Sequence, residues 1–166
     1  GEAERAIDQR NAFMMTTMLK DVVSYGTATR ALTLGRKDLA GKTGTTNENV
    51  DAWFAGYNSS LVGVACIGCD QPRTLGGNET GAVAALPIWI AYMQKALKGL
   101  PEKSLEPPSG VVSLRINADT GLRDEGGTVS EWFYGEYLPR REESLAPPTP
   151  TPGGGRSSQE VRNQLF

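Results

Sequence analysis

The stretch that decides the fold lies between residues 39 and 67 and reads LAGKTGTTNENVDAWFAGYNSSLVGVACI. Three parts of it have the composition of β-strands: residues 39–46 alternate between two faces, residues 52–57 are aromatic and apolar, and residues 61–67 are almost continuously apolar. Short turns rich in Asn and Ser separate them. Strands joined by such turns pair antiparallel, so the sequence predicts a three-stranded meander. Because the third strand is so apolar, we expect it to be buried on both faces.

A helix is predicted before this meander, over residues 8–24, because apolar residues recur there every three or four positions. Asp8 or Asn11 can cap its start, and Gly26 is placed for a cap at its end. We expect the apolar stripe of this helix to face the core. Its members are Ala12, Met15, Met18, Leu19, Val22 and Val23.

A second helix is predicted after the meander, over residues 80–97, and Lys95 and Lys98 suit its C-terminal end. Pro87 lies inside the pattern and should either kink the helix or mark its true first turn. The apolar stripe of this helix is formed by Ala82, Ala85, Leu86, Trp89, Ile90 and Met93.

Composition excludes several kinds of chemistry. With 39% hydrophobic residues, 22% charged residues and a net charge of -2, the chain resembles an ordinary globular protein, and we expect no nucleic acid or acidic membrane surface as a partner. The chain has no histidine, which excludes Ser-His-Asp and Cys-His catalysis and most zinc sites. Any acid–base group must therefore be Lys, Asp, Glu or Tyr. We expect neither a cofactor nor a metal.

The two cysteines, Cys66 and Cys69, read C-I-G-C at the end of an apolar strand-like run. A redox pair with this spacing normally begins a helix, whereas residues three apart on a strand point to opposite faces. Two ligands without others nearby do not make a metal site. We therefore interpret these residues as two buried or half-buried thiols.

The chain is predicted to have three parts. Residues 1–100 form the end of a folded domain, residues 101–143 form an extension, and residues 144–166 form a tail rich in Pro, Gly and Ser that should be disordered. The extension begins with a linker and carries a predicted strand over residues 111–116, followed by a turn. It ends in an aromatic patch made of Trp132, Phe133, Tyr134 and Tyr137.

Both ends of the chain carry further signals. Ser157 and Glu160 have the spacing of a capping box, so the tail has room for a short, marginal helix. No stretch is long and apolar enough to span a bilayer, and no signal peptide is visible. The chain begins at Gly1 without a methionine, so we expect a fragment of a longer protein.

The segment Gly41-Lys42-Thr43-Gly44-Thr45 carries the chemistry. A phosphate-binding loop, G-x-x-x-x-G-K-[ST], is one interpretation. Its first glycine should stand at position 36, but that residue is Arg36, and the glycine lies one place earlier at Gly35. Such a loop must also open a helix, whereas Asn47-Glu48-Asn49 and then an apolar strand follow here. A nucleotide-binding function is therefore disfavoured.

The other interpretation is the K-T-G strand of serine acyl-enzymes, which binds a peptide or lactam along the edge of a sheet. Gly44 would let a substrate backbone approach closely, because no Cβ blocks it. Lys42 would supply positive charge for a terminal carboxylate and lower the pKa of a nearby proton-relay hydroxyl. The hydroxyls of Thr43 and Thr45 can hydrogen-bond the same carboxylate, and a backbone N–H just past the glycine can supply half of an oxyanion hole.

A longer pattern surrounds this segment. It consists of RNA at 10–12, MLKDVV at 18–23, GTA at 26–28, DLAGKTGTTNE at 38–48, DAWFAGY at 51–57, GCDQPRTLG at 68–76, ETG at 79–81 and ALPIW at 85–89. The pattern closely resembles the transpeptidase domain of class A penicillin-binding proteins. The resemblance is strong over about residues 5–100 and weaker over residues 111–138.

The resemblance implies an α/β (α+β) fold, an antiparallel sheet with helices on both faces, as in serine β-lactamases and transpeptidases. The first strands and the all-helical lobe of that fold would be missing, and the two predicted helices should pack on one face of the sheet. It also implies a bifunctional peptidoglycan synthase whose transpeptidase acylates a serine with the D-Ala-D-Ala end of a stem peptide. The implied partners are peptidoglycan stem peptides and β-lactam antibiotics. The implied location is the periplasmic face of the bacterial inner membrane, reached through a missing N-terminal anchor.

Carried over residue by residue, the resemblance makes Lys42, Thr43 and Gly44 the third motif of the family. Thr43 and Thr45 would hold the substrate carboxylate, and the Thr45 N–H would complete the oxyanion hole. Lys42 would sit beside the serine of the second motif and tune the proton path.

The sequence departs from a complete enzyme of this family. No serine is followed by lysine three residues later, and no S-x-N is present; Thr17-Met18-Leu19-Lys20 has the first spacing, but with threonine on a predicted core helix. We therefore expect the nucleophile upstream of Gly1 and an inactive isolated chain, whose unpaired sheet edge makes it aggregation-prone. Two alternatives stay open: a non-catalytic binding or regulatory module on the same scaffold, and a β-lactamase-like hydrolase.

Overall fold

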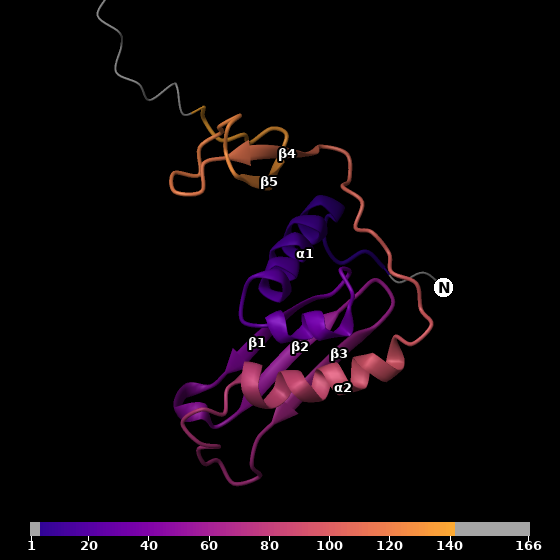
Figure 1. Ribbon diagram of the computed structural model, residues 1–166, viewed down its shortest axis with the longest axis vertical. Coiled ribbons are helices and arrows are strands. Elements are labelled where there is room, and N and C mark those ends of the chain that lie inside the picture. Colours follow the sequence, from indigo (N-terminus) through magenta and orange to yellow (C-terminus); the bar gives the residue numbers. More distant parts are fainter. Residues whose placement is uncertain (1–3, 142–166) are drawn as a thin grey trace, which may run out of the picture. The chain divides into compact units, whose positions relative to one another are not determined.

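The computed structural model describes residues 4–141. The chain divides into two compact units, with the boundary between Val112 and Ser113 (Figure 1). In chain order the elements are α1 (Gln9–Ser24), η1 (Thr29–Leu34), β1 (Ala40–Thr45), η2 (Asn47–Asn49), β2 (Ala52–Tyr57), β3 (Val62–Ile67), η3 (Gly81–Ala85), α2 (Leu86–Ala96), β4 (Val111–Ile116) and β5 (Val129–Tyr134). The three-part division at residues 100 and 143 stays a prediction.

In the first unit, β1, β2 and β3 form one antiparallel sheet in that order, so the predicted meander is confirmed. The turn between β2 and β3 is closed by Asn58. Its side-chain oxygen accepts hydrogen bonds from the backbone N–H groups of Ser60 at 3.0 Å and Leu61 at 2.9 Å. An Asn side chain that caps its own turn explains why the Asn-Ser-Ser segment reverses the chain here.

The third strand is not buried on both faces, so this prediction is wrong. Val62 is 76% exposed and Val64 is 60% exposed, and Cys66 is exposed too, whereas Ala65 between them is buried. The alternation arises because β3 is a margin of the sheet and α2 covers only one of its faces in the described part of the chain. The expected burial of Cys66 is wrong for the same reason, while Cys69 is half-buried as expected.

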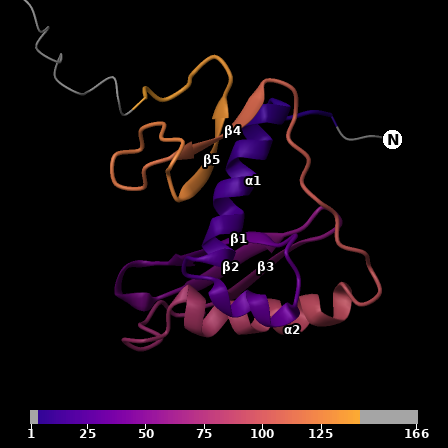
Figure 2. The ribbon, with the colours of Figure 1, turned by 45° about the horizontal axis from the view of Figure 1, so that its top comes forward.

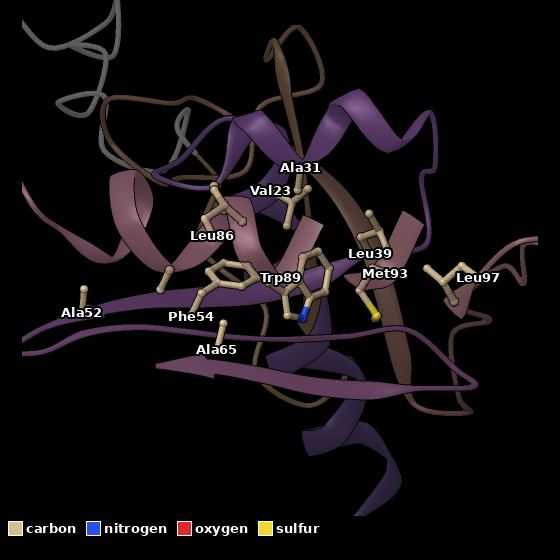
Figure 3. Close-up of a cluster of buried hydrophobic side chains, with 12 residues drawn as sticks. Val23, Ala31, Leu39, Ala52, Phe54, Ala65, Leu86, Trp89, Met93 and Leu97 are labelled. Carbon is tan, nitrogen blue, oxygen red and sulfur yellow. The ribbon is translucent and has the colours of Figure 1, made fainter. Parts of the chain in front are cut away.

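The core of the first unit lies between the sheet and α2 (Figure 3). The rings of Phe54 and Trp89 meet edge to face, with centroids 4.9 Å apart and an interplanar angle of 68°. The indole N–H of Trp89 donates a hydrogen bond of 3.1 Å to the carbonyl oxygen of Gly63. A Cβ at Gly56 would lie 2.7 Å from the indole, so the close approach of Trp89 to the sheet requires glycine there.

The second helix begins with the π turn η3 and continues as α2. Pro87 lies in the first turn of α2, which confirms one of its two predicted positions. Proline is tolerated there because the first N–H groups of a helix have no intrahelical partner. The predicted apolar stripe is confirmed as core at Ala85, Leu86, Trp89 and Met93, and is half-buried at Ala82 and Ile90.

Helix α1 begins as predicted but ends for a different reason. The carboxylate of Asp8 caps it by accepting hydrogen bonds of 2.9 and 3.4 Å from two backbone N–H groups of the first turn. At the other end the capping residue is Tyr25, and Gly26 does not have the left-handed conformation expected of a C-cap glycine. A Cβ at Gly26 would lie 2.8 Å from the Cα of Val22, so glycine serves a close backbone approach instead.

The apolar stripe of α1 is core only in part. Phe13 and Val23 are buried, but Met15 is 48% exposed and Met18 is 54% exposed, contrary to the prediction. Val23, in the last turn, belongs to the same buried cluster as the residues of α2. Figure 2 shows α1 rising away from the sheet, which explains why the middle of its stripe lies outside this cluster.

Arg36 forms a nearly buried ion pair with Asp38 just before β1 and also links this segment to the residues that follow α2. Arg36 Nη2 lies 2.6 Å from Asp38 Oδ2, and the two side chains are 11% and 5% exposed. The side-chain amide of Asn58 donates to the same carboxylate at 3.1 Å, and Arg36 also donates to the carbonyl oxygens of Leu100 and Pro101. Burial would raise the pKa of Asp38, but the hydrogen bonds from Arg36 and Asn58 outweigh it and hold this pKa below the usual carboxyl value.

Strands β4 and β5 form a two-stranded sheet that lies in the second unit except for the first two residues of β4, and β4 has the predicted bounds. The predicted turn after β4 is present, and the side chain of Asn117 accepts hydrogen bonds from two of its backbone N–H groups. In the predicted aromatic patch, the rings of Tyr134 and Tyr137 are perpendicular, with centroids 6.5 Å apart.

Two expectations concern residues outside the described range, namely the disorder of residues 144–166 and the capping pair Ser157 and Glu160. Within residues 4–141, no helix has the length and apolar character needed to cross a bilayer. The same residues contain no group of three His, Cys, Asp or Glu side chains suited to a metal ion.

Candidate functional site: the K-T-G strand

The K-T-G segment lies on β1, at one margin of the sheet. Lys42 is paired with Ala55 of β2, and Thr43 is paired with Phe54. Among the described residues no strand pairs with the other edge of β1. The segment is an extended strand and not a turn that opens a helix, so it lacks the geometry of a phosphate-binding loop. A strand margin of this kind can add an extended peptide through main-chain hydrogen bonds.

The side chain of Lys42 is exposed. Its ammonium group donates a hydrogen bond of 3.0 Å to the carbonyl oxygen of Thr43 and lies 3.4 Å from the Thr43 hydroxyl. Because an ammonium group has three protons, these contacts leave donor capacity for an anion at the margin. The positive charge is thus held against the strand backbone, beside the hydroxyl of the next residue.

The side chain of Thr43 is half-buried and points toward the turn that follows α1. Its hydroxyl oxygen lies 2.8 Å from the hydroxyl oxygen of Thr27, and either group can be the donor. The hydroxyl of Thr43 therefore has two neighbours, an ammonium group and a second hydroxyl, and its orientation depends on both.

Thr45 lies at the end of β1, where the π turn η3 packs against the strand. Its hydroxyl oxygen accepts a hydrogen bond of 3.1 Å from the backbone N–H of Gly81. Gly81 is buried, and a Cβ there would collide with the carbonyl oxygens of Trp53 and Gly44. This contact uses a lone pair of the Thr45 hydroxyl and leaves its proton available for another acceptor. Gly44 itself is half-buried, and a Cβ at this position would lie 3.3 Å from the Cβ of Trp53.

The turn after β1 is held in an unusual conformation. Glu48 and Asn49 have φ angles of 59° and 52°, in the left-handed region that residues other than glycine seldom adopt. Asn49 compensates with two contacts to the following loop: its side-chain amide donates to the carbonyl oxygen of Gly76 at 3.1 Å, and its carbonyl oxygen accepts from the N–H of Leu75 at 2.8 Å. The end of the K-T-G strand is therefore anchored to the loop that precedes η3.

Sequence reasoning missed two residues of this site, Thr27 and Gly81. Thr27 is 16 positions from its partner Thr43, and Gly81 is 36 positions from its partner Thr45. Both belong to short segments of the resemblance, GTA and ETG, but no spacing rule connects those segments to β1. The only signal in the sequence was that Thr27 and Gly81 have no evident role in the structure of their own segments.

Comparison with known proteins identifies the family of the chain. Residues 2–85 match the family model described as the penicillin binding protein transpeptidase domain. Penicillin-binding protein 1A of Pseudomonas aeruginosa is 51% identical over 154 residues, which are 91% of this chain and 19% of that protein. Penicillin-binding protein 1A of Neisseria lactamica is 50% identical over 111 residues, which are 67% of this chain and 14% of that protein.

The fold has a counterpart among solved structures. The crystal structure of penicillin-binding protein 1A from Haemophilus influenzae matches with a TM-score of 0.79 at 36% identity, over 84% of this chain and 22% of that one. This match confirms the expected α/β fold, an antiparallel sheet flanked by helices. The chain spans about a fifth of the length of the Pseudomonas relative. The matched segment contains the whole three-stranded sheet and its K-T-G strand, and the chain belongs to the penicillin-binding protein transpeptidase family.

Proposed function

We propose that this chain is the K-T-G-bearing part of a serine-type D-Ala-D-Ala transpeptidase within a bifunctional peptidoglycan synthase. The enzyme cross-links peptidoglycan stem peptides, and β-lactam antibiotics acylate the same serine. The observation that carries the proposal is the arrangement of Lys42, Thr43 and Thr45 along one unpaired strand margin. Membership of the transpeptidase family supports the same reaction class.

In this function the margin of β1 recognises a carboxylate. The Lys42 ammonium supplies the charge, and the hydroxyl protons of Thr43 and Thr45 supply two hydrogen bonds to the terminal carboxylate of a stem peptide or to the carboxylate of a β-lactam. The peptide lies along β1 as an added strand, and Gly44 keeps this path free of a side chain. Such hydrogen bonds to an ionised group are shorter and stronger than those between neutral groups.

The same strand contributes to the chemical step. The backbone N–H of Thr45 is one of two donors that stabilise the oxyanion formed when the serine attacks the peptide or lactam carbonyl. Lys42 lies beside the serine of the second motif and lowers the pKa of that hydroxyl, which favours proton transfer to the leaving amine. Neither that serine nor the nucleophile is part of this sequence, which has no S-x-x-K and no S-x-N.

Two consequences follow for the isolated chain and for the whole synthase. The isolated chain binds no penicillin covalently, because it lacks the nucleophile. The synthase acts at the periplasmic face of the bacterial inner membrane, and it reaches the membrane through a segment outside this sequence.

The test is covalent labelling of the full-length synthase with fluorescent penicillin. Lys42→Ala should lower the acylation rate by about a hundredfold or more, the size expected when a preorganised charge or donor is removed. Lys98→Ala, which removes an exposed lysine beyond the end of α2, is the matched control and should leave the rate unchanged. Equal labelling of the Lys42→Ala variant and the parent would refute the role of Lys42.

The same assay separates the alternatives. A long-lived penicilloyl adduct supports a transpeptidase, whereas rapid deacylation with turnover of penicillin would indicate a β-lactamase-like hydrolase. Absence of labelling in the unmodified synthase would indicate a non-catalytic module on the same scaffold. Labelling of the isolated 166-residue chain would show that it contains a nucleophile of its own.

A further inference from the structure

The contact between Thr27 and Thr43 links the turn after α1 to the margin of β1. The two hydroxyl oxygens lie 2.8 Å apart, although Thr27 is an exposed residue in the turn after α1. An exposed threonine can satisfy its hydroxyl with water, so neither burial nor secondary structure requires this contact. It joins the turn to the residue that binds the substrate carboxylate in the proposed function.

The residues on both sides of Thr27 are held by hydrogen bonds and close packing. On one side, the N–H of Gly26 donates to the last turn of α1, and a Cβ at Gly26 would lie 2.8 Å from the Cα of Val22. On the other side, Ala28 is fully buried in the core, and its N–H donates to the carbonyl oxygen of Val22 at 3.0 Å. The position of the Thr27 Cα is therefore set by its two neighbours. Only the χ1 torsion of Thr27 then determines which group its hydroxyl contacts.

The direction of this hydrogen bond decides what Thr43 can do. A hydroxyl has one proton and two acceptor sites, while a carboxylate only accepts hydrogen bonds. If Thr43 donates to Thr27, its single proton is not free for a carboxylate. If Thr27 donates to Thr43, the Thr43 proton is free, and the nearby Lys42 ammonium occupies the acceptor side of the same oxygen at 3.4 Å.

We infer that Thr27 is a positioning residue for carboxylate recognition: its hydroxyl donates to Thr43 Oγ1 and directs the Thr43 proton toward the carboxylate of the substrate. The inference rests on the proposed function and names a part of that site outside the K-T-G segment. Thr27 acts through Thr43 and does not touch the substrate. A donor chain of this kind also polarises the Thr43 hydroxyl and strengthens its hydrogen bond to the carboxylate.

The first experiment measures acylation of the full-length synthase by benzylpenicillin over a range of concentrations. Thr27→Val keeps the shape of the side chain but removes the hydroxyl, and it should weaken the apparent affinity by about threefold to tenfold, the range for one hydrogen bond, with little change in the limiting acylation rate. Thr27→Ser keeps the hydroxyl and should restore the affinity to within about twofold. Thr29→Val, at another exposed threonine of the same segment, is the matched control and should behave as the parent.

The second experiment tests whether Thr27 acts through Thr43. In a Thr43→Val background, Thr27→Val should have no further effect, because the hydroxyl that it orients is gone. Equal losses in both backgrounds would show a direct contact with the ligand and overturn the inference, as would parent-like affinity of the single Thr27→Val variant. If Thr27→Val does not fold, as judged by its melting curve, Thr27→Ala takes its place, and parent-like affinity of that variant overturns the inference in the same way.

The two proposals fail separately. Unchanged labelling of Lys42→Ala removes the proposed function and with it the site in which Thr27 acts. A strong effect of Lys42→Ala together with parent-like behaviour of Thr27→Val removes only the inference about Thr27.

Discussion

The two margins of the three-stranded sheet carry different side chains, although each outer strand pairs with β2 alone among the described strands. Neither β1 nor β3 has a second strand partner among the described residues. The margin of β1 carries Lys42 and Thr43, whereas the margin of β3 carries Val62 and Val64, which are 76% and 60% exposed. Water forms hydrogen bonds with the first set of side chains, whereas contact of the second set with water is unfavourable. An unpaired edge is therefore a candidate binding site at β1 and an aggregation hazard at β3.

The difference also extends to the contacts behind each margin. At β1 the hydroxyls of Thr43 and Thr45 contact the hydroxyl of Thr27 and the N–H of Gly81, so each hydroxyl oxygen is held in place by a second element of the fold. At β3 the exposed valines present no polar group that could be directed. Orientation of polar groups by a rigid scaffold distinguishes a recognition surface from a merely open edge.

The largest effect should come from the core that supports both margins. Trp89→Ala removes an indole that packs on the ring of Phe54 and donates a hydrogen bond to the carbonyl oxygen of Gly63. It should lower the free energy of unfolding by about 3–5 kcal/mol. Urea denaturation measures this change. Tyr92→Ala is the control, because the side chain of Tyr92 on the same helix is 58% exposed. This variant should lower the free energy of unfolding far less. Similar losses for the two variants would contradict the assignment of the core.

The next effect concerns the start of β1 and depends on pH. Because the pKa of Asp38 is lowered in the folded state, its contribution to stability is complete above the unfolded pKa near 3.8 and disappears as the pH falls through the lower folded value. Asp38→Asn should therefore cost about 1.5–3 kcal/mol at neutral pH, and the gap to the parent should narrow below about pH 4.

The measurement is urea denaturation at several pH values. Asp21→Asn, at an exposed position of α1, provides the charge-matched comparison. A gap between parent and Asp38→Asn that stays constant down to strongly acidic pH would show that the Asp38 carboxylate does not account for the difference.

A somewhat smaller effect is expected at the other end of β1. Gly81→Ala places a methyl group against the carbonyl oxygens of Trp53 and Gly44, so it should destabilise the chain by about 1–3 kcal/mol and displace the end of the K-T-G strand. Gly77→Ala is the control, because a Cβ there would have no atom within 4 Å and the φ angle is ordinary. Melting temperatures of the two variants provide the comparison, and indistinguishable values would argue against close packing at Gly81.

The smallest effect on stability is expected at the apolar margin, where the change should appear in solubility. Val64→Lys should alter the free energy of unfolding by no more than about 0.5 kcal/mol, because the side chain is exposed. It should slow aggregation of the chain, since a charge on an edge strand opposes edge-to-edge pairing. Light scattering over time measures this, with Thr29→Lys as the charge-matched control. Equal protection by both lysines would indicate net charge and not the β3 margin as the cause.

Local structure was predicted well where neighbouring residues determine it. The bounds of β2 and β4, the cap at Asp8 and the position of Pro87 in the first turn of α2 all follow from patterns within a few residues. Burial was predicted poorly where it depends on distant elements. The side chains of Met15, Met18 and one face of β3 are apolar but exposed. An apolar pattern shows which face of an element prefers burial, but it does not show whether another element covers that face.

The sequence by itself determined the strands β1 to β4, the two long helices and the position of the K-T-G segment on a strand, because backbone periodicity, turn residues and motif spacing are properties of adjacent positions. Only the tertiary structure decided which groups contact that segment. The contacts of Thr43 with Thr27 and of Thr45 with Gly81 join residues 16 and 36 positions apart. A hydrogen bond forms only when two atoms approach to about 3 Å, and that proximity is set by the packing of α1 and η3 around β1.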